Sequence, residues 1–146
     1  MMRTGPVIAA FDGSANADKA LRQAVELARQ CGTHLVVVNV QPSLSTRNTR
    51  RFFSKQEIAQ YVRETGLSVL EQTRDFLQSA GIRYEYAVLT GGPADELCAY
   101  AKETDARYIV MGRRGMNPIL TKILGSVVSA VTEKASCPVV VVPPEA

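Results

Sequence analysis

Residues 107–142 read RYIVMGRRGMNPILTKILGSVVSAVTEKASCPVVVV, and they predict a strand, a glycine-containing loop, a helix and a second strand. The apolar run Tyr108–Met111 has the length of a strand and ends at Gly112. Gly125 and Ser126 lead into apolar residues at helical spacing, and Val139–Val142 forms the second strand. A helix that begins at Gly-Ser presents unpaired N–H groups and the positive end of its dipole. The stretch therefore predicts an anion site, with phosphate as the expected anion.

Along the whole chain, apolar strands alternate with amphipathic helices. The predicted strands are residues 7–11, 34–40, 83–89, 107–111 and 139–142. The predicted helices follow Ser14 up to Gly32, run from Lys55 to Ala80 with Gly66 as a weak point, and run from Pro93 to Thr104. Such alternation predicts right-handed crossovers and one parallel sheet with helices on both faces. We expect residues 1–146 to form a single α/β domain, an open five-stranded Rossmann-like sheet of strand order 3-2-1-4-5.

Two segments depart from this regular pattern. Residues 83–89 alternate apolar and polar side chains, which is typical of a half-exposed edge strand. Residues 41–54 contain a proline, serines, threonines and three arginines, which predicts a mobile surface loop. Those arginines, Arg47, Arg50 and Arg51, are either solvated or able to reach a bound polyanion.

Composition excludes several classes of protein. The net charge of +3 is too small to predict a nucleic-acid or membrane partner, and the apolar runs are too short to span a bilayer. The N-terminus shows no secretory pattern. Cys31, Cys98 and Cys137 have no C-x-x-C spacing, and their apolar neighbours predict that all three are buried. Unpaired thiols favour a cytoplasmic location.

Two distant segments are predicted to meet at one crevice. Ligands of open parallel sheets bind beyond the carboxyl ends of the strands, where the strand order reverses. In the expected order this point lies between the first strand, which ends at Asp12, and the fourth, which ends at Gly112. Asp12 either accepts hydrogen bonds from ribose hydroxyls or forms a turn ahead of the helix. Ser126 is either a helix cap or a phosphate contact, and Arg114 is either solvated or bound to phosphate.

The glycine spacing resembles that of a known family. Gly112-x2-Gly115-x9-Gly125-Ser126, placed between a strand and a helix, is similar to the ATP-binding signature of the universal stress protein family. The resemblance extends over nearly the whole chain and includes the turn after the first strand and the closing Cys137-Pro138 with its valine run. It implies a fold like that of the adenine nucleotide alpha hydrolases and a role in the stress response.

The resemblance also implies roles for particular residues. Val40 would meet adenine through its backbone, Asp12 would meet adenine or ribose, and Met111 and Gly112 would line the ribose side. The phosphates, with Mg²⁺ or Mn²⁺, would lie against four residues: Gly115, Gly125, Ser126 and Val127. Arg114 stands where many ATP-binding members have histidine and keeps a positive charge there. The strand Val139–Val142 would join two subunits into a homodimer.

Other classes fit the sequence less well. An adenylating enzyme with this kind of sheet needs a serine-glycine-glycine loop after the first strand, where this chain has Asp12-Gly13-Ser14. Nucleotidyl transferases use paired histidines, and His34 is the one histidine in the chain. Gly112-Arg113-Arg114-Gly115 matches the G-x-x-G loop of RNA-binding KH domains, but that loop joins two helices. We therefore expect an ATP-binding sensor or switch without efficient turnover, because no general base lies beside the phosphates. The alternative is a dimeric stress protein that binds no nucleotide and acts through partners.

Overall fold

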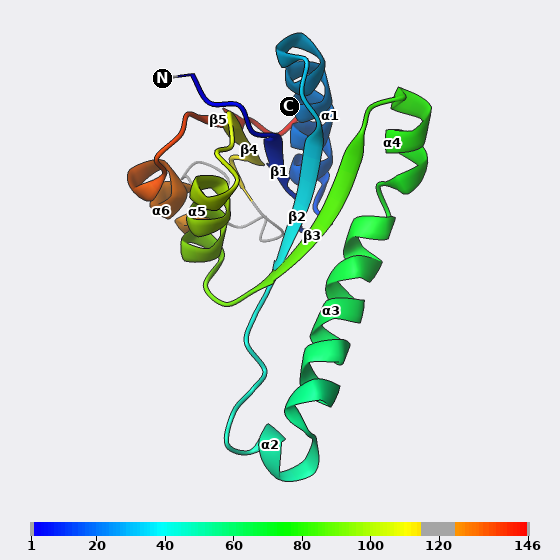
Figure 1. Cartoon of the computed structure of the whole chain (residues 1–146), viewed down its shortest axis with the longest axis vertical. Coiled ribbons are helices and arrows are strands. Elements are labelled where there is room, and N and C mark those ends of the chain that lie inside the picture. Colours follow the sequence, from blue (N-terminus) through cyan, green and yellow to red (C-terminus); the bar gives the residue numbers. More distant parts are fainter. Residues whose placement is uncertain (1, 115–124, 146) are drawn as a thin grey trace.

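The computed structural model describes residues 2–114 and 125–145. The strands are β1 (Val7–Ala10), β2 (Leu35–Gln41), β3 (Tyr84–Thr90), β4 (Tyr108–Gly112) and β5 (Val139–Val142). The helices are α1 (Ala15–Cys31), α2 (Thr49–Phe52), α3 (Lys55–Glu71), α4 (Arg74–Ala80), α5 (Pro93–Glu103) and α6 (Ser126–Lys134). Figure 1 shows these elements around one twisted sheet, with α2 at the end of an arm that extends away from it.

The strands form one parallel sheet of order β3-β2-β1-β4-β5, which confirms the predicted fold and the edge position of β3. Val7 of β1 is paired with Leu35 of β2 on one side and with Tyr108 of β4 on the other. Because β1 is central, the chain reverses its direction of winding there. The carboxyl ends of β1 and β4 therefore lie side by side, as the sequence predicted.

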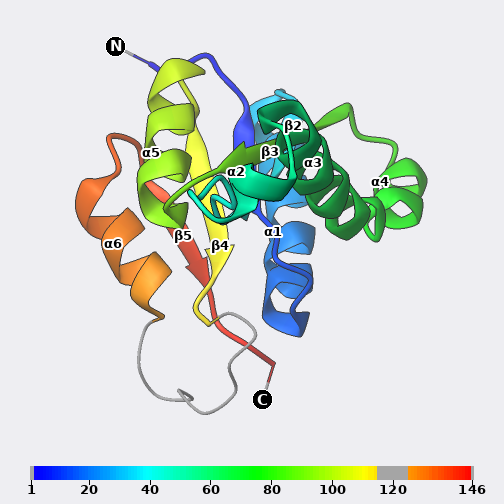
Figure 2. The same ribbon diagram turned by 90° about the horizontal axis from the view of Figure 1, so that it is seen from below.

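Helices cover both faces of the sheet and enclose two apolar cores (Figure 2). On one face, α1, α3 and α4 pack over the strands, and the fully buried side chains include Leu21, Leu35 and Leu70. On the other face, α5 and α6 cover Ile8 and Ile109. Apolar residues on both sides of a strand explain why β1, β2 and β4 are near-continuous apolar runs.

The helix predicted from Lys55 to Ala80 is two helices, so the prediction of one continuous helix was wrong. The chain turns at Gln72 and Thr73, and the Thr73 hydroxyl lies 2.7 Å from the Leu70 carbonyl oxygen and 2.9 Å from the Tyr86 hydroxyl. Thr73 is buried, so these contacts of its hydroxyl fix the direction of the chain between α3 and α4. The turn allows Leu77 of α4 to reach the core.

Gly66 is a close contact rather than a weak point of α3. A Cβ atom at this position would lie 2.5 Å from Cγ1 of Val88 and 3.2 Å from Oδ1 of Asn39. The missing side chain therefore lets α3 approach β2 and β3 more closely than any other residue would allow.

Two smaller predictions also need correction. The segment 41–54 is not loop throughout, because it contains the short helix α2. Cys137 is buried as expected, but Cys31 and Cys98 are only half-buried. Burial raises the pKa of the Cys98 and Cys137 thiols, so neither is a reactive thiolate at neutral pH. The Nδ1 of His34 lies 3.0 Å from a guanidinium nitrogen of Arg83, and its Nε2 lies 3.0 Å from a carboxylate oxygen of Glu85.

Candidate functional site

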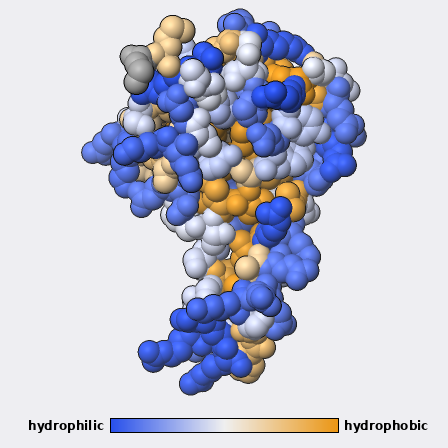
Figure 3. Space-filling view, viewed as in Figure 1, coloured by the Kyte–Doolittle hydropathy of each residue, from blue (hydrophilic) through white to orange (hydrophobic). Residues whose placement is uncertain are grey.

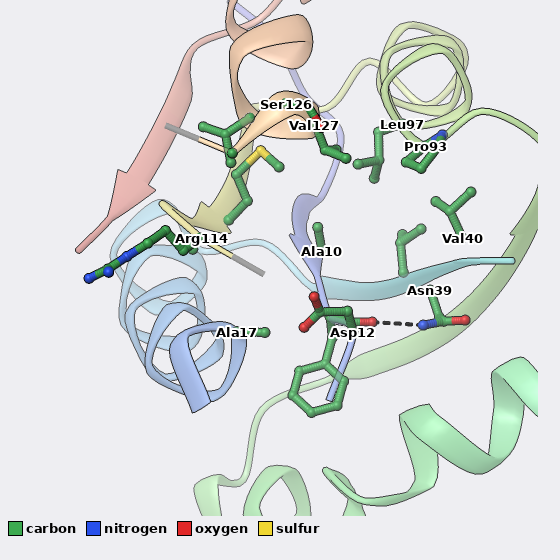
Figure 4. A pocket seen from close by; sticks show the side chains of 16 residues that line it. Ala10, Asp12, Ala17, Asn39, Val40, Pro93, Leu97, Arg114, Ser126 and Val127 are labelled. Carbon is green, nitrogen blue, oxygen red and sulfur yellow. Dashed lines mark hydrogen bonds between the residues drawn. The ribbon is translucent and has the colours of Figure 1, made fainter. Parts of the chain in front are cut away.

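A cavity of about 390 Å³ lies at the carboxyl ends of β1, β2 and β4, where the strand order reverses. Its size is within the range of small-molecule sites in proteins. The lining comes from the strand ends and from the first turns of α1, α5 and α6 (Figure 4). The lining residues are Ala10, Phe11, Asp12, Ala17, Val38, Asn39, Val40, Pro93, Leu97, Met111, Gly112, Arg114, Gly125, Ser126, Val127 and Val128.

Asp12 brings a carboxylate to the floor of this cavity. Its Oδ1 accepts a hydrogen bond of 2.9 Å from the Ser14 N–H, and Gly13 between them has φ +87°. Ser14 in turn caps α1 by accepting from the Ala17 N–H at 3.1 Å. The turn therefore holds the carboxylate in place through one oxygen. Figure 4 shows the Asp12 carboxylate facing the cavity, across from Ser126 and Val127.

The start of α6 forms the opposite wall. Gly125 is the N-cap residue and Ser126 the first helical residue, and no side chain among residues 2–114 and 125–145 caps the helix. Ser126 is exposed and follows the N-cap residue, so it is not itself the N-cap; its contact with an anion stays a prediction. The first N–H groups of an uncapped helix attract an anion or water. A Cβ at Gly125 would lie 3.6 Å from the Arg113 carbonyl oxygen, so the described part of the chain has room for a side chain there.

Gly112 has a different reason to be glycine. A Cβ there would lie 2.7 Å from Cγ of Asn16, a buried residue at the start of α1. Asn16 donates to the Val142 carbonyl oxygen at 3.0 Å and accepts from the Arg114 N–H at 2.9 Å. Gly112 lines the cavity, and its missing side chain makes room for Asn16. This asparagine ties the loop after β4 to α1 and to β5.

Arg114 lines the cavity, but its guanidinium does not point into it. Figure 4 shows this group directed away from Asp12 and from Val127. Arg114 is half-buried, and its role toward phosphate stays a prediction. A phosphate contact would require the side chain to rotate.

Apolar side chains form the remaining wall. Val40 at the end of β2 faces Pro93 and Leu97 of α5 in Figure 4. Met111 also lines the cavity and is almost fully buried. Such a wall suits a flat, weakly polar ring. Asn39 adds a buried amide, whose Nδ2 donates to the Phe11 carbonyl oxygen at 2.9 Å and whose Oδ1 accepts from Gln41 at 2.6 Å.

The structure thus brings most of the predicted site residues together. Asp12, Val40, Met111, Gly112, Arg114, Gly125, Ser126 and Val127 all line this one cavity. Gly115 lies outside the described residues. Sequence reasoning missed Asn16 and Asn39. One signal was available for Asn39, since it interrupts the valine-rich run of β2.

Comparison with known proteins assigns a family to this arrangement. The sequence model of the universal stress protein family matches residues 4–143. Universal stress protein YxiE of Bacillus subtilis (strain 168) is 31% identical over 145 residues, which cover 93% of this chain and 97% of YxiE.

Solved structures agree with the match. The universal stress protein from Archaeoglobus fulgidus in complex with dAMP is 28% identical, with a TM-score of 0.66 over 97% of this chain and 99% of that chain. Universal stress protein UspA from Lactobacillus plantarum reaches a TM-score of 0.77 at 23% identity, over 97% of this chain and 99% of that one. The latter likeness concerns the fold alone.

Proposed function

Because the chain belongs to the universal stress protein family, we propose that its cavity binds an adenine nucleotide, ATP, and that the protein is a nucleotide-dependent sensor or switch in the stress response. One observation carries this proposal. The Asp12 carboxylate and the uncapped start of α6 lie on opposite sides of a single cavity whose third wall is apolar. The complex of the Archaeoglobus fulgidus relative with dAMP supports the choice of adenine.

The chemistry of each wall gives an orientation for the nucleotide. Adenine would lie against Val40 and Leu97, with its edge polar groups directed to backbone groups at the end of β2. The ribose hydroxyls would donate to the Asp12 carboxylate, which keeps one oxygen free of the Ser14 turn. The phosphates would lie at Gly125 and Ser126, where N–H groups and the helix dipole favour negative charge.

The proposed Mg²⁺ or Mn²⁺ would enter with the phosphates. Within residues 2–114 and 125–145 there is no group of three or more His, Cys, Asp or Glu side chains suited to a metal. A divalent ion bound chiefly by phosphate oxygens and water needs no such group.

We propose that the protein holds its nucleotide without efficient turnover. Among the described lining residues, Asp12 is the one carboxylate, and the proposed orientation places it at the sugar. A general base must come within hydrogen-bond reach of the attacking water, directly or through one further water. Asp12 would be too far from the terminal phosphate for this role.

Replacement of Gly125 by valine tests the phosphate assignment. We expect Gly125→Val to lose ATP binding in titration calorimetry, because its side chain would occupy the space of the phosphates. The fold should persist, since a Cβ at this position makes an ordinary contact with the described residues. Ser129→Val on the exposed side of the same helix is the matched control and should bind ATP normally. Unchanged ATP affinity in Gly125→Val would remove α6 from the phosphate site.

Native mass spectrometry of the purified protein is a second, independent test, because it reports the number of subunits and any bound nucleotide together. We expect a dimer that retains an adenine nucleotide. A dimer that never carries or binds nucleotide would instead favour a stress protein that acts through partners alone.

A further inference from the structure

The small net charge of the chain conceals an uneven distribution. We call residues 46–57 the tip; it comprises α2, the residues around it and the first residues of α3. The tip contains four cationic residues, Arg47, Arg50, Arg51 and Lys55, and one acidic residue, Glu57, so its net charge is +3. The rest of the chain has 13 cationic and 13 acidic residues and is neutral. The tip therefore carries the net charge of the whole chain.

None of the tip's cations is neutralised by a partner in the part of the chain that the structure describes. The ion pairs there are Arg22–Asp18, Arg29–Glu26, His34–Glu85, Arg74–Glu71 and Lys134–Asp95. All four cationic residues of the tip are exposed. Their field is thus available to an outside partner.

Two neighbouring phenylalanines accompany these cations. Phe52 is 78% exposed and Phe53 is 54% exposed, although phenylalanine is among the residue types most often buried. Figure 1 places α2 at the end of the arm farthest from the sheet, and Figure 3 shows hydrophobic residues beside strongly hydrophilic ones at that end. The tip is therefore both basic and apolar at its outermost surface.

The tip is a folded element and not a loose tail. The Thr49 hydroxyl donates to the Leu44 carbonyl oxygen at 2.6 Å, and the Phe53 N–H donates to the Thr49 carbonyl oxygen at 2.9 Å. Ser54 and Glu57 form a capping box that begins α3 directly after the phenylalanines. These bonds hold Phe52 and Phe53 outside the protein core.

Charge and shape together select the partner. A second copy of the tip would bring like charges together, so self-association through this surface is unfavourable. Phe52 and Phe53 line neither the cavity at the strand ends nor a second cavity, which borders the tip at Lys55 and is also lined by Leu44 and Ile58. They belong to α2 and to the residue directly after it, at the projecting end of the arm (Figure 1), and a projecting apolar end is readily buried in a partner that yields to it. The headgroup layer of a bilayer does so, and anionic lipids add attraction for clustered cations.

We propose that the tip docks the protein peripherally on anionic lipid surfaces, with Phe52 and Phe53 inserted at the interface and the four cations against lipid headgroups. In the described residues no helix is long and apolar enough to cross a bilayer. The proposal does not depend on nucleotide binding.

A fluorescence experiment tests insertion directly. The chain contains no tryptophan, so Phe52→Trp creates a single reporter at the tip. We expect its emission to shift to shorter wavelength with vesicles of equimolar phosphatidylcholine and phosphatidylglycerol, and not with phosphatidylcholine alone. Ala99→Trp, exposed on α5, is the control and should not respond to either vesicle. No shift of the Phe52→Trp emission on the anionic vesicles overturns the proposal.

Co-sedimentation with the same vesicles, using protein without the tryptophan substitutions, measures the contribution of charge to binding. Each lost cation should weaken binding about fivefold, so Arg50→Gln with Arg51→Gln should weaken it roughly 25-fold. Lys102→Gln, an exposed cation on α5, should have no effect. Binding should disappear at roughly 1 M salt, where screening is nearly complete. Unchanged affinity of the double arginine variant for the anionic vesicles contradicts the proposed contact between the cations and the headgroups. Oligomers that form through Phe52 in the absence of vesicles contradict a lipid partner.

Discussion

At the scale of single residues, Gly112 and Gly125 of the glycine signature are needed for different reasons. Gly112 is required by the protein itself, because Asn16 occupies the space where its side chain would be. Gly125 meets no such obstacle among the described residues and borders the cavity. A motif that looks uniform in the sequence thus combines one glycine that packs the fold with one that leaves the proposed phosphate site open.

Asp12 holds the turn before α1 and, in the proposed orientation, also meets the ribose; a pair of substitutions separates these two roles. Asp12→Ala should weaken ATP roughly 10- to 100-fold, the cost of one or two hydrogen bonds to a charged group. Inorganic triphosphate should be affected far less, because it has no ribose. Asp12→Asn keeps an acceptor for the Ser14 N–H, so it should preserve the α1 turn while still weakening ATP. Calorimetric titration with both ligands measures the difference, and equal losses for the two ligands would remove Asp12 from the ribose.

At the scale of elements, local patterns predicted most of the fold and none of the buried polar contacts. The strands and α1 were predictable because apolar periodicity and end signals such as Ser14 and Gly32 are local. The break between α3 and α4 was not, because Thr73 has its partner in Tyr86, on a strand that comes later in the chain. Asn16 was missed for the same reason, since it bonds to Val142 at the other end of the chain.

The packing of α3 on the sheet gives a prediction at this scale. Gly66→Ala should destabilise the protein by about 1 kcal/mol, because overpacking against Val88 costs about 1–3 kcal/mol and exceeds the helix propensity gain of about 1 kcal/mol. Urea denaturation measures the free energy of unfolding. In a Val88→Ala background the obstacle is shorter, so Gly66→Ala should be neutral or stabilising there. The same destabilisation in both backgrounds would show that α3 is not held by this contact.

At the scale of the whole molecule, the proposed dimer depends on the free edge of β5. Within the described residues, β5 pairs with β4 alone, and its other edge has no strand beside it. The Pro138 and Val142 carbonyl oxygens accept from Ile109 and Arg113 of the β4 side. Because backbone groups alternate along a strand, Val140 also faces β4, whereas Val139 and Val141 present theirs to the free edge.

This alternation allows the dimer to be broken without loss of the fold. Val141→Pro removes an N–H from the free edge and leaves the bonds between β4 and β5 intact, so we expect a folded monomer. Val141→Thr keeps that N–H and a β-branched side chain, and it should remain a dimer. Light scattering gives the mass of each variant, and circular dichroism verifies the fold. A folded Val141→Pro dimer would place the subunit contact elsewhere, since no ladder at this edge could tolerate the missing donor at its centre.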